Sequence, residues 1–329
     1  VRMSDLKNNL LKIFGKNSNI IEENPANIVY ERFSSGSLLL DKNLKEGFVK
    51  GTAVEIAGNS GSGKTTLAIH TVSEHQKKYP DEIVMWIDLE KTFDPVYFQK
   101  IGINLEPENF ILIRPSQGED VWTAMIEMYK NYGKGIVVLD SIATLINAKE
   151  FEGDVGDAQM AGAARMNSQG WRKILPFMKF GGTTLIAINQ FRKNIGGYGL
   201  SDVTTGGGAW EYFTRTRIKA SVSKGVEELY GKHKYTLLKA TFGHKDTIAE
   251  TTIYYGEGIN KNRELLDLCV EYEIIEKKGS WFSYKDSNLA QGADAVTNLF
   301  EDNIELVEEL TEKLLLKLKP KKEEINENN

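Results

Sequence analysis

The sequence predicts an α/β fold built on a twisted, mostly parallel sheet, and three observations predict it. Apolar, β-branched runs alternate with segments of helical periodicity along much of the chain. Several of these runs end in a carboxylate or an amide, the position that faces a ligand at the carboxyl edge of an open parallel sheet. One run, 52–57, is followed at once by a glycine-rich loop, 58–66, and by a helical pattern over 65–78.

The glycine-rich loop, GNSGSGKTT at 58–66, has the phosphate-binding spacing of two glycines, a lysine and a hydroxyl. Gly58 and Gly63 let the backbone curl, so that its N–H groups and the N-terminus of the next helix face an anion. Lys64 would reach the β and γ phosphates of a nucleotide, and Thr65 would ligate magnesium. A glycine-rich turn without a ligand is the alternative. The expected nucleotide contacts in this loop are Gly58, Asn59, Ser60, Gly61, Ser62, Gly63, Lys64, Thr65 and Thr66.

Two further strand-like runs carry acidic residues at their ends. The run 83–88 ends in Asp88, and Glu90 follows it closely. Glu90 would orient an attacking water or take its proton, whereas a solvated acidic turn is the alternative. The run 135–141 contains Asp140 in the Walker B pattern, which would place a carboxylate beside the magnesium. A carboxylate that only caps a buried strand remains the alternative at this position.

The segment FDPVYF, 93–98, predicts the start of a helix. Asp94 would cap it, with proline in the first helical position. Tyr97 would present its ring to an adenine, or pack in the core as most helical aromatics do.

A basic helix follows the Walker B strand. The segment 150–159 is polar and contains glycine, which predicts a loop, and 161–177 has helical periodicity. Arg165 and Arg172 are seven residues apart, so both fall on one face and would bind phosphates. A solvated helix face is the other interpretation.

The next buried strand ends in the amide of Gln190, which can hydrogen-bond a γ-phosphate. It leads directly into the glycine-rich segment 191–210, which also contains Arg192, Lys193 and Tyr198. Glycines, cations and an aromatic ring suit a loop that orders around single-stranded nucleic acid. A plain flexible linker is the alternative.

The sequence predicts that the chain divides into four parts. An amphipathic helix at 3–14 lies within an N-terminal arm, 1–30, and packs either on its own core or on a neighbouring subunit. The core would span 31–256, a small α/β domain 257–318, and a charged tail without apolar anchors 319–329, which we expect to be disordered. Three strand-like segments are expected to extend the core sheet in antiparallel fashion: 217–222, 235–242 and 250–255.

The amino-acid composition limits the classes of protein to which this chain can belong. The 329 residues are 41% hydrophobic and 26% charged, as in ordinary globular proteins. A single cysteine excludes an intramolecular disulfide framework, and neither a signal peptide core nor a long apolar stretch is present, so we expect a cytoplasmic protein without a membrane partner. The net charge of −5 is unusual for a nucleic-acid binder. A protein that polymerises can nevertheless line a central groove with a few cations per subunit.

Longer strings make the chain resemble the bacterial RecA family of DNA strand-exchange recombinases, and their order along nearly the whole chain agrees. They are GSLLLD, GNSGSGKTTLAIH, IDLEKTFDPVYFQKIGI, VVLDSIATL, EFEGDVGDAQMAGAARMNSQGWRK, INQFRKNIG, TTGGGA, YGEGIN and GSWFSYKDSNLAQG. The resemblance implies a P-loop NTPase core of RecA type, a small C-terminal α/β domain, ATP and Mg²⁺ as cofactors, and a function in DNA recombination and repair. It also implies a homo-oligomeric helical filament on single-stranded DNA that pairs with double-stranded DNA, with the helix 3–14 docked on the next subunit and with single-strand-binding and mediator proteins as partners.

The resemblance also implies roles for single residues. Glu90 would activate water with Lys64 and Gln190 as further catalytic residues, Thr65 and Asp140 would hold the metal, and Asp94 and Tyr97 would contact adenine. The implied DNA contacts are Glu152, Gly153, Met160, Arg165, Ser168, Arg172, Arg192, Lys193, Ile195, Gly196, Tyr198, Thr205, Gly206 and Gly207.

Some positions depart from the family pattern. Two lysines that reach ATP from the neighbouring subunit read here as Lys239 and Thr241, and Glu211 stands where the family has lysine. Lys239 therefore remains an expected nucleotide contact, Lys245 is a candidate to compensate for Thr241, and a divergent, phage-encoded member would fit these changes. Two other activities would use a similar core: a ring helicase, and a scaffold that coats DNA without hydrolysing ATP.

Overall fold

The computed structural model describes residues 3–14, 30–154, 162–193, 202–223, 229–285 and 287–318. The chain divides into two compact units, Val1–Tyr30 and Glu31–Asn329. In the first unit, α1 (Met3–Phe14) confirms the predicted amphipathic helix. Leu6 and Ile13 on this helix are 55% and 72% exposed.

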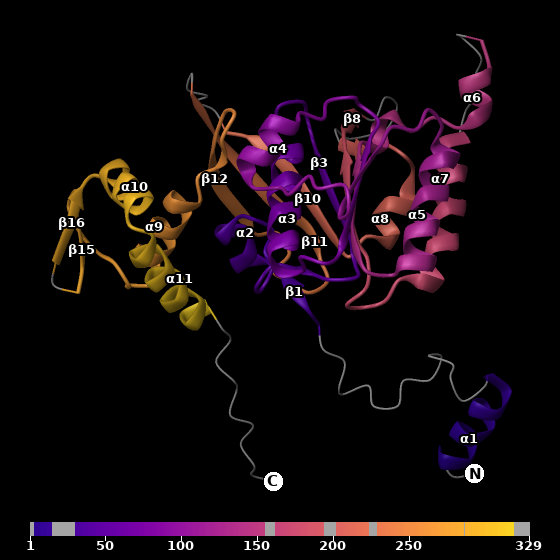
Figure 1. Ribbon diagram of the computed structural model, residues 1–329, viewed down its shortest axis with the longest axis horizontal. Helices are drawn as coiled ribbons and strands as arrows, with labels where there is room; N and C mark the ends of the chain where they lie inside the picture. Colours follow the sequence, from indigo (N-terminus) through magenta and orange to yellow (C-terminus); the bar gives the residue numbers. More distant parts are fainter. Residues whose placement is uncertain are drawn as a thin grey trace. The chain divides into compact units, whose positions relative to one another are not determined.

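The second unit is built on a nine-stranded sheet with the order β13-β12-β11-β10-β3-β7-β6-β4-β5 (Figure 1). Its strands are β3 (Ala53–Gly58), β4 (Ile83–Asp88), β5 (Phe110–Ile113), β6 (Gly135–Asp140), β7 (Thr184–Asn189), β10 (Thr216–Val222), β11 (Tyr230–Ala240), β12 (Ile248–Tyr254) and β13 (Gly258–Ile259). The neighbours from β10 to β5 pair in parallel, and those from β10 to β13 pair antiparallel. The mostly parallel sheet predicted from the apolar runs is therefore confirmed.

The predicted antiparallel direction of 217–222 is wrong. This segment is β10, and it runs parallel to β3, with Arg217 opposite Glu55. A short helix, α8 (Gly208–Phe213), lies between β7 and β10 and returns the chain to the same end of the sheet, as parallel strands require. The other two predicted segments fall in β11 and β12, which follow through shorter connections, and each of these strands pairs antiparallel with the strand before it.

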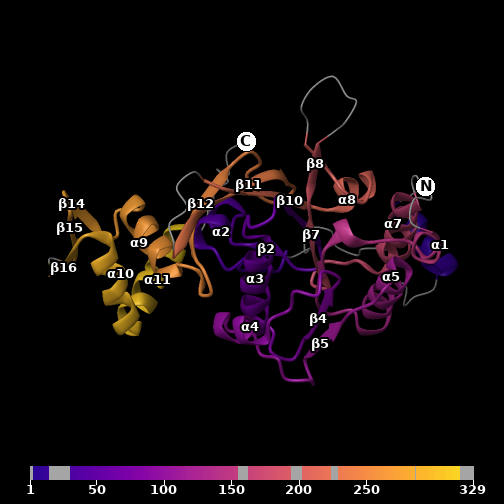
Figure 2. The ribbon, with the colours of Figure 1, turned by 90° about the horizontal axis from the view of Figure 1, so that it is seen from above.

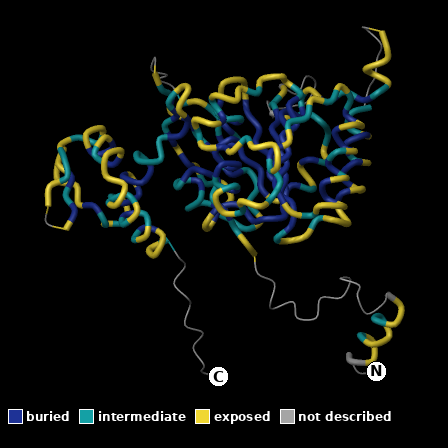
Figure 3. Tube along the Cα trace, in the orientation of Figure 1, coloured by how far each residue is buried: buried dark blue, intermediate teal, exposed yellow. Residues whose placement is uncertain are grey.

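Helices cover both faces of this sheet, and Figure 2 shows α3 and α4 on the opposite side from α5, α7 and α8. The helices that precede α8 in this unit are α2 (Leu38–Asn43), α3 (Lys64–Lys78), α4 (Pro95–Ile101), α5 (Gly118–Glu127), α6 (Ala148–Glu152) and α7 (Gly162–Ile174), with a π-helical turn at Met128–Tyr132 and 3-10 turns at Ile142–Thr144 and Leu175–Phe177. Unlike the others, α6 has no buried residue. Alternate side chains of one strand enter different cores: Trp86 packs with α3 and α4, and Ile87 packs with α5 and α7. The central strands are consequently buried on both faces (Figure 3), which explains their continuous apolar runs.

The C-terminal part has a core of its own. It contains α9 (Lys261–Glu271), α10 (Ala293–Asp302) and α11 (Ile304–Leu318), with a three-stranded sheet of β14 (Glu276–Lys278), β15 (Trp281–Tyr284) and β16 (Ser287–Gln291). Cys269, Phe300 and Leu310 are among its buried residues. Two short antiparallel pairs complete the fold: β1 (Arg32–Phe33) with β2 (Phe48–Val49), and β8 (Phe191–Lys193) with β9 (Asp202–Thr204).

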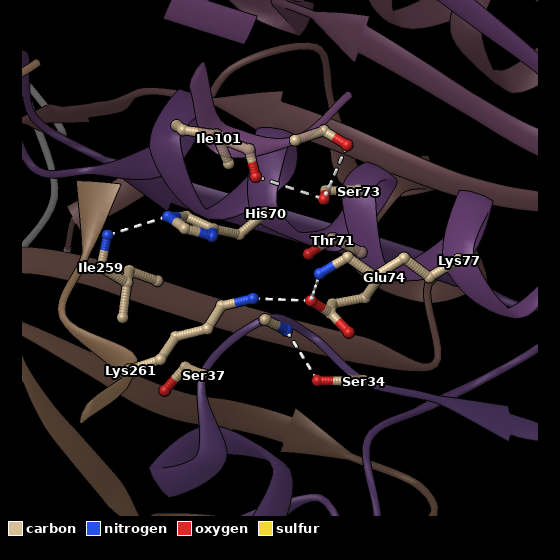
Figure 4. A network of polar contacts seen from close by, with 12 residues as sticks. Ser34, Ser37, His70, Thr71, Ser73, Glu74, Lys77, Ile101, Ile259 and Lys261 are labelled. Carbon is tan, nitrogen blue, oxygen red and sulfur yellow. Dashed lines mark hydrogen bonds and ion pairs between the residues drawn. The ribbon is translucent and has the colours of Figure 1, made fainter. Parts of the chain in front are cut away.

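Polar contacts fix the middle of α3 to the start of the C-terminal part (Figure 4). His70 Nε2 accepts a hydrogen bond from the backbone N–H of Ile259 at 2.8 Å. Glu74 forms an ion pair with Lys261 at 2.6 Å. Ser73 Oγ donates to the carbonyl of Ile101, where α4 ends. These contacts hold the helix whose N-terminus belongs to the glycine-rich loop 58–66.

Within the part of the chain that the structure describes, every helix is too short or too polar to cross a membrane.

Candidate nucleotide site and candidate DNA-binding loops

The loop 58–66 joins β3 to α3 through positions that require glycine. Gly63 has φ +85°, in the left-handed region that side chains disfavour. A Cβ atom at Gly58 would lie 2.3 Å from the carbonyl oxygen of Ala220 on the neighbouring strand. The predicted strand, loop and helix order is thus confirmed, with the loop packed closely against β10.

Lys64 and Thr65 begin α3 and face the carboxyl edge of the sheet. Lys64 Nζ donates to the carbonyl oxygen of Asn59 at 2.8 Å, within the loop. Burial lowers the pKa of Lys64, while the negative charges of Glu90 and Asp140 act in the opposite direction. Thr65 Oγ1 donates to Asp140 Oδ2 at 3.1 Å, so the two predicted metal ligands are adjacent.

Asp140 ends β6 in surroundings that suit a divalent cation. Burial, together with the charges of Glu90 and Asp88, raises the pKa of its carboxyl to about 7, against the opposing effects of Thr65 and Lys64. A bound cation would stabilise the ionised carboxylate at this position, and oxygen ligands are those that Mg²⁺ prefers. The residues present therefore fit the predicted magnesium site.

Glu90 and Gln190 are brought together, although 100 residues separate them in the chain. Gln190 Nε2 lies 3.4 Å from Glu90 Oε1. Ser141 Oγ donates to the same carboxylate oxygen at 2.6 Å. Ser141 was missed in the sequence, although it directly follows Asp140 in the string VVLDS and so had to lie at this edge of the sheet.

Asp88 reaches the same edge but has a different environment from Glu90. It is 1% exposed and accepts hydrogen bonds from the backbone N–H of Thr92 at 3.0 Å and from Arg114 Nε at 3.0 Å. These bonds occupy both of its carboxylate oxygens. Asp88 thus shapes the turn after β4, and Glu90 is the acidic residue of the pair that stays exposed.

Asp94 and Tyr97 stand at the beginning of α4, beside α3. Asp94 Oδ1 accepts from the backbone N–H groups of Val96 at 2.9 Å and Tyr97 at 3.3 Å, which confirms the predicted cap. The hydroxyl groups of Tyr97 and Thr66 lie 3.2 Å apart. The Tyr97 ring is half-buried against the core on the α3 side of the sheet, so it both packs and borders the loop 58–66.

The glycine-rich segment 191–210 begins directly after Gln190, and Thr205 in its later part is hydrogen-bonded to the end of β7. The backbone N–H of Thr205 donates to the carbonyl oxygen of Gln190 at 3.3 Å. Asn189 Nδ2 donates to the Thr205 carbonyl oxygen at 3.0 Å, and Thr205 Oγ1 donates to Asn189 Oδ1 at 2.5 Å. Asn189, which was not among the predicted site residues, thus joins Gln190 to the far end of this segment.

The predicted DNA contacts on α7 lie on its outer face. Arg165 and Arg172 are exposed and Ser168 is half-buried, whereas Met166 and Trp171 on the other face are buried. Asn167 Nδ2 donates to the carbonyl oxygen of Gly206 at 2.8 Å, so α7 lies beside the end of the glycine-rich segment 191–210. Of the other predicted DNA contacts, Glu152 and Gly153 are exposed at the end of α6, and Arg192 is exposed on β8. For Lys193 the structure describes only the backbone. The remaining predicted contacts lie outside the described residues: Met160, Ile195, Gly196 and Tyr198.

Lys239 is placed apart from the other predicted nucleotide contacts. Its Nζ donates to the carbonyl oxygens of Glu211 at 2.9 Å and Tyr212 at 3.1 Å, on α8. Thr241 Oγ1 donates to the Arg215 carbonyl oxygen at 3.0 Å. A pocket of about 490 Å³ is bordered by Lys239, Thr241 and Lys245 together with residues of α8.

Two protein-family models together match nearly the whole chain. The family model for the RecA N-terminal domain matches residues 3–260, and the model for the RecA C-terminal domain matches residues 263–319. The chain belongs to the RecA family. Protein RecA of Porphyromonas gingivalis is 40% identical over 286 residues, which are 85% of this chain and 83% of that protein. Protein RecA of Rickettsia bellii is 36% identical over 321 residues (96% and 92%), and that of Arthrospira platensis 34% over 317 residues (95% and 86%). Membership of the RecA family thus extends over both the sheet that holds the candidate site and the C-terminal part.

Proposed function

We propose that this protein is an ATP-dependent homologous recombinase that forms helical filaments on single-stranded DNA and exchanges strands with a homologous duplex. The observation that carries the proposal is the contact of Glu90 with Gln190, because it joins a candidate catalytic carboxylate to the glycine-rich segment 191–210. Membership of the RecA family supports the recombination and ATP-binding parts of the proposal.

In the proposed hydrolysis, the phosphates of ATP bind at the loop 58–66 and Lys64 contacts them. Thr65 and Asp140 would hold Mg²⁺, which would neutralise charge on the phosphate oxygens. Glu90 orients the attacking water and accepts its proton. Ser141 keeps the Glu90 carboxylate in one orientation through its hydrogen bond.

We infer that Gln190 couples hydrolysis to DNA binding. Its side chain contacts Glu90, and its backbone carbonyl oxygen binds the N–H of Thr205 at the end of the glycine-rich segment. A change of Gln190 between ATP-bound and ADP-bound states would therefore move that end of the segment. In nucleotide switches of this kind, a bound γ-phosphate orders a segment of the protein, and hydrolysis releases that segment.

The proposal assigns the DNA-facing surface to the outer face of α7 and to the segments that flank it. Arg165 and Arg172 would bind phosphates, and Gly206 and Gly207 would let the backbone approach the strand. The exposed apolar residues of α1 would dock on the next subunit of the filament. The boundaries 1–30, 31–256, 257–318 and 319–329, a cytoplasmic location, and single-strand-binding and mediator proteins as partners belong to the same proposal.

One experiment tests the proposed function. ATP hydrolysis is measured with and without single-stranded DNA, and strand exchange is then measured on matched and unmatched duplexes. A recombinase gives DNA-stimulated hydrolysis and product from matched duplex alone. Hydrolysis without stimulation, or no joint molecules, would contradict it.

Two controls separate the rival activities. Electron microscopy with ATP and DNA distinguishes a filament from the closed rings that a helicase would form. Glu90→Gln should abolish the ATP turnover of wild type, whereas in a scaffold that merely coats DNA Glu90 would be inert, and the variant and wild type would not differ in turnover.

A further inference from the structure

A network of hydrogen bonds and ion pairs, largely buried, crosses the sheet beside the candidate site. Glu55 lies on β3 and is 0% exposed. Its Oε1 accepts from Asn189 Nδ2 at 2.7 Å, and its Oε2 accepts from Arg217 Nε at 2.5 Å. Because a buried carboxylate without hydrogen-bond partners is costly, Asn189 and Arg217 together stabilise the buried side chain of Glu55 in the sheet.

Asn189 links Glu55 to Gln190, because its side chain forms hydrogen bonds with both residues. Its Oδ1 accepts from the backbone N–H of Gln190 at 2.8 Å and from Thr205 Oγ1 at 2.5 Å. The hydrogen bond from Nδ2 to Glu55 fixes which way the amide group points. Glu55 therefore sets the orientation in which Asn189 holds both Gln190 and the end of the glycine-rich segment 191–210.

Arg217 lies on the other side of Glu55 from Asn189, and each of its three guanidinium nitrogens contacts a different acceptor. Nε binds Glu55, Nη2 donates to Thr204 Oγ1 at 3.2 Å, and Nη1 lies 2.8 Å from Glu211 Oε1. An irregularity in the β10–β11 pairing falls between Arg217 and Ile218, a feature that redirects a side chain. The planar guanidinium can join three acceptors in different directions, which a lysine cannot do.

Glu211 is the surface-exposed member of this network. Its side chain is 68% exposed, and that of Arg217 is 11% exposed. Glu211 is also the acidic residue that departs from the lysine of the family pattern, and its pairing with Arg217 explains how an acid fits at this position. Arg217 and Lys239 are opposite each other on β10 and β11, so Glu211 offsets their mutual repulsion.

We propose that Arg217 is a positioning residue that, through Glu55 and Asn189, holds Gln190 and the Thr204–Thr205 end of the glycine-rich segment in register, and that Glu211 adjusts this connection from the surface. The inference rests on the proposed function only where Gln190 is taken to link the γ-phosphate with DNA. The positions of the side chains do not depend on that step.

The test uses full-length Arg217→Lys and Glu211→Gln, with Glu250→Gln as the matched control. Glu250 is also an exposed acid in an ion pair at this sheet, with Lys234 at 3.0 Å, but it has no link to Asn189. Two quantities are measured: amide hydrogen exchange of peptides containing Gln190 and Thr205, without nucleotide or DNA, and the ratio of ATP hydrolysis with and without single-stranded DNA.

Arg217→Lys should speed exchange in both peptides about tenfold, because it removes charged hydrogen bonds. Glu211→Gln should speed it about threefold, as expected for loss of an exposed ion pair. Both variants should lower the stimulation by DNA, and Glu250→Gln should behave as wild type. If Arg217→Lys fails to fold, Glu211→Gln decides, since its side chain is at the surface.

The outcomes separate this inference from the proposed function. Wild-type exchange in both Arg217→Lys and Glu211→Gln would overturn the positioning role, even if DNA still stimulates hydrolysis. Faster exchange in a protein that DNA does not stimulate would support the positioning role and remove the proposed function.

Discussion

At the scale of single residues, the hydroxyl of Ser141 is a hydrogen-bond donor to the proposed catalytic carboxylate. It holds Glu90 Oε1 at 2.6 Å. Ser141→Ala should leave the carboxylate free to rotate and lower kcat for ATP hydrolysis about tenfold, the equivalent of one hydrogen bond to a charged group. The KM for ATP should stay within about twofold, because Ser141 is not among the proposed phosphate contacts.

The matched control is Thr144→Val. Thr144 Oγ1 donates to the Ser141 carbonyl oxygen at 2.9 Å in the same turn but has no bond to Glu90. Steady-state kinetics of both variants with DNA present make the comparison. Equal kcat values for Ser141→Ala and wild type would remove the orienting role of this serine.

Glu264 gives a prediction about pH and stability. It is 1% exposed on α9, and its carboxylate accepts from Ser37 Oγ at 2.8 Å and from the backbone N–H of Leu38 at 2.6 Å. Burial raises its pKa to about 7, and burial likewise raises the pKa of nearby Asp41 to about 6. The folded protein therefore binds these protons more tightly than the unfolded chain, and stability falls as pH rises from about 5 to about 7.

Glu264→Gln should remove much of this pH dependence, because the amide stays neutral and can still bond to Ser37 and Leu38. The free energy of unfolding, measured in denaturant at pH 5 and pH 8, should fall with pH by about 3 kcal/mol less in the variant than in wild type. Glu271→Gln, which alters an exposed acid on the same helix, is the control. The same slope in all three proteins would show that Glu264 does not titrate in this range.

At the scale of elements, α7 and α8 are joined through the end of the glycine-rich segment 191–210. Gly206 has φ +86°, and a Cβ atom added there would lie 2.5 Å from Ile142 Cγ2. Its carbonyl oxygen accepts from Asn167, which in turn accepts from Trp122 Nε1 at 3.1 Å. The position of this turn is therefore set by the packing of α5 and α7.

Gly206→Ala should lower the free energy of unfolding by about 2 kcal/mol, through backbone strain and the forced shift of Ile142. Gly208→Ala is the control, since a Cβ atom there meets no atom within 4 Å and the residue begins α8. It should change stability by less than about 0.5 kcal/mol. Chemical denaturation of the two variants checks this; equal losses would contradict the packing described for Gly206.

The same scale shows what could be predicted from the sequence. Strands β4, β6 and β7 and the helix α3 were predictable because continuous apolar runs and a phosphate-binding spacing are local signals. The parallel direction of β10 was not, because it depends on the short helix α8, whose glycine-rich surroundings look like a loop. Ser141 followed a predicted residue and was within reach, but the pairing of Glu55 with Arg217 joins strands far apart in the chain, and no local pattern indicates it.

At the scale of the whole molecule, the arrangement of the candidate site supports the proposed connection between nucleotide chemistry and DNA binding. Glu90, Ser141 and Gln190 meet at one edge of the sheet, and Asn189 joins that edge to the segment beside α7. Lys239, in contrast, is held by α8, away from the loop 58–66 of its own chain. This placement agrees with the proposal that Lys239 serves the ATP site of a neighbouring subunit in a filament.

The coupling through Gln190 is tested most directly by comparing ATP hydrolysis with and without single-stranded DNA in wild type and in Gln190→Ala. Gln76→Ala serves as the control, because Gln76 is a half-buried glutamine of α3 whose side chain donates to the Asn104 carbonyl oxygen. We predict that wild type and Gln76→Ala are stimulated by DNA, whereas Gln190→Ala binds ATP normally and hydrolyses it at one rate with or without DNA. Stimulation of Gln190→Ala equal to that of wild type would contradict the coupling.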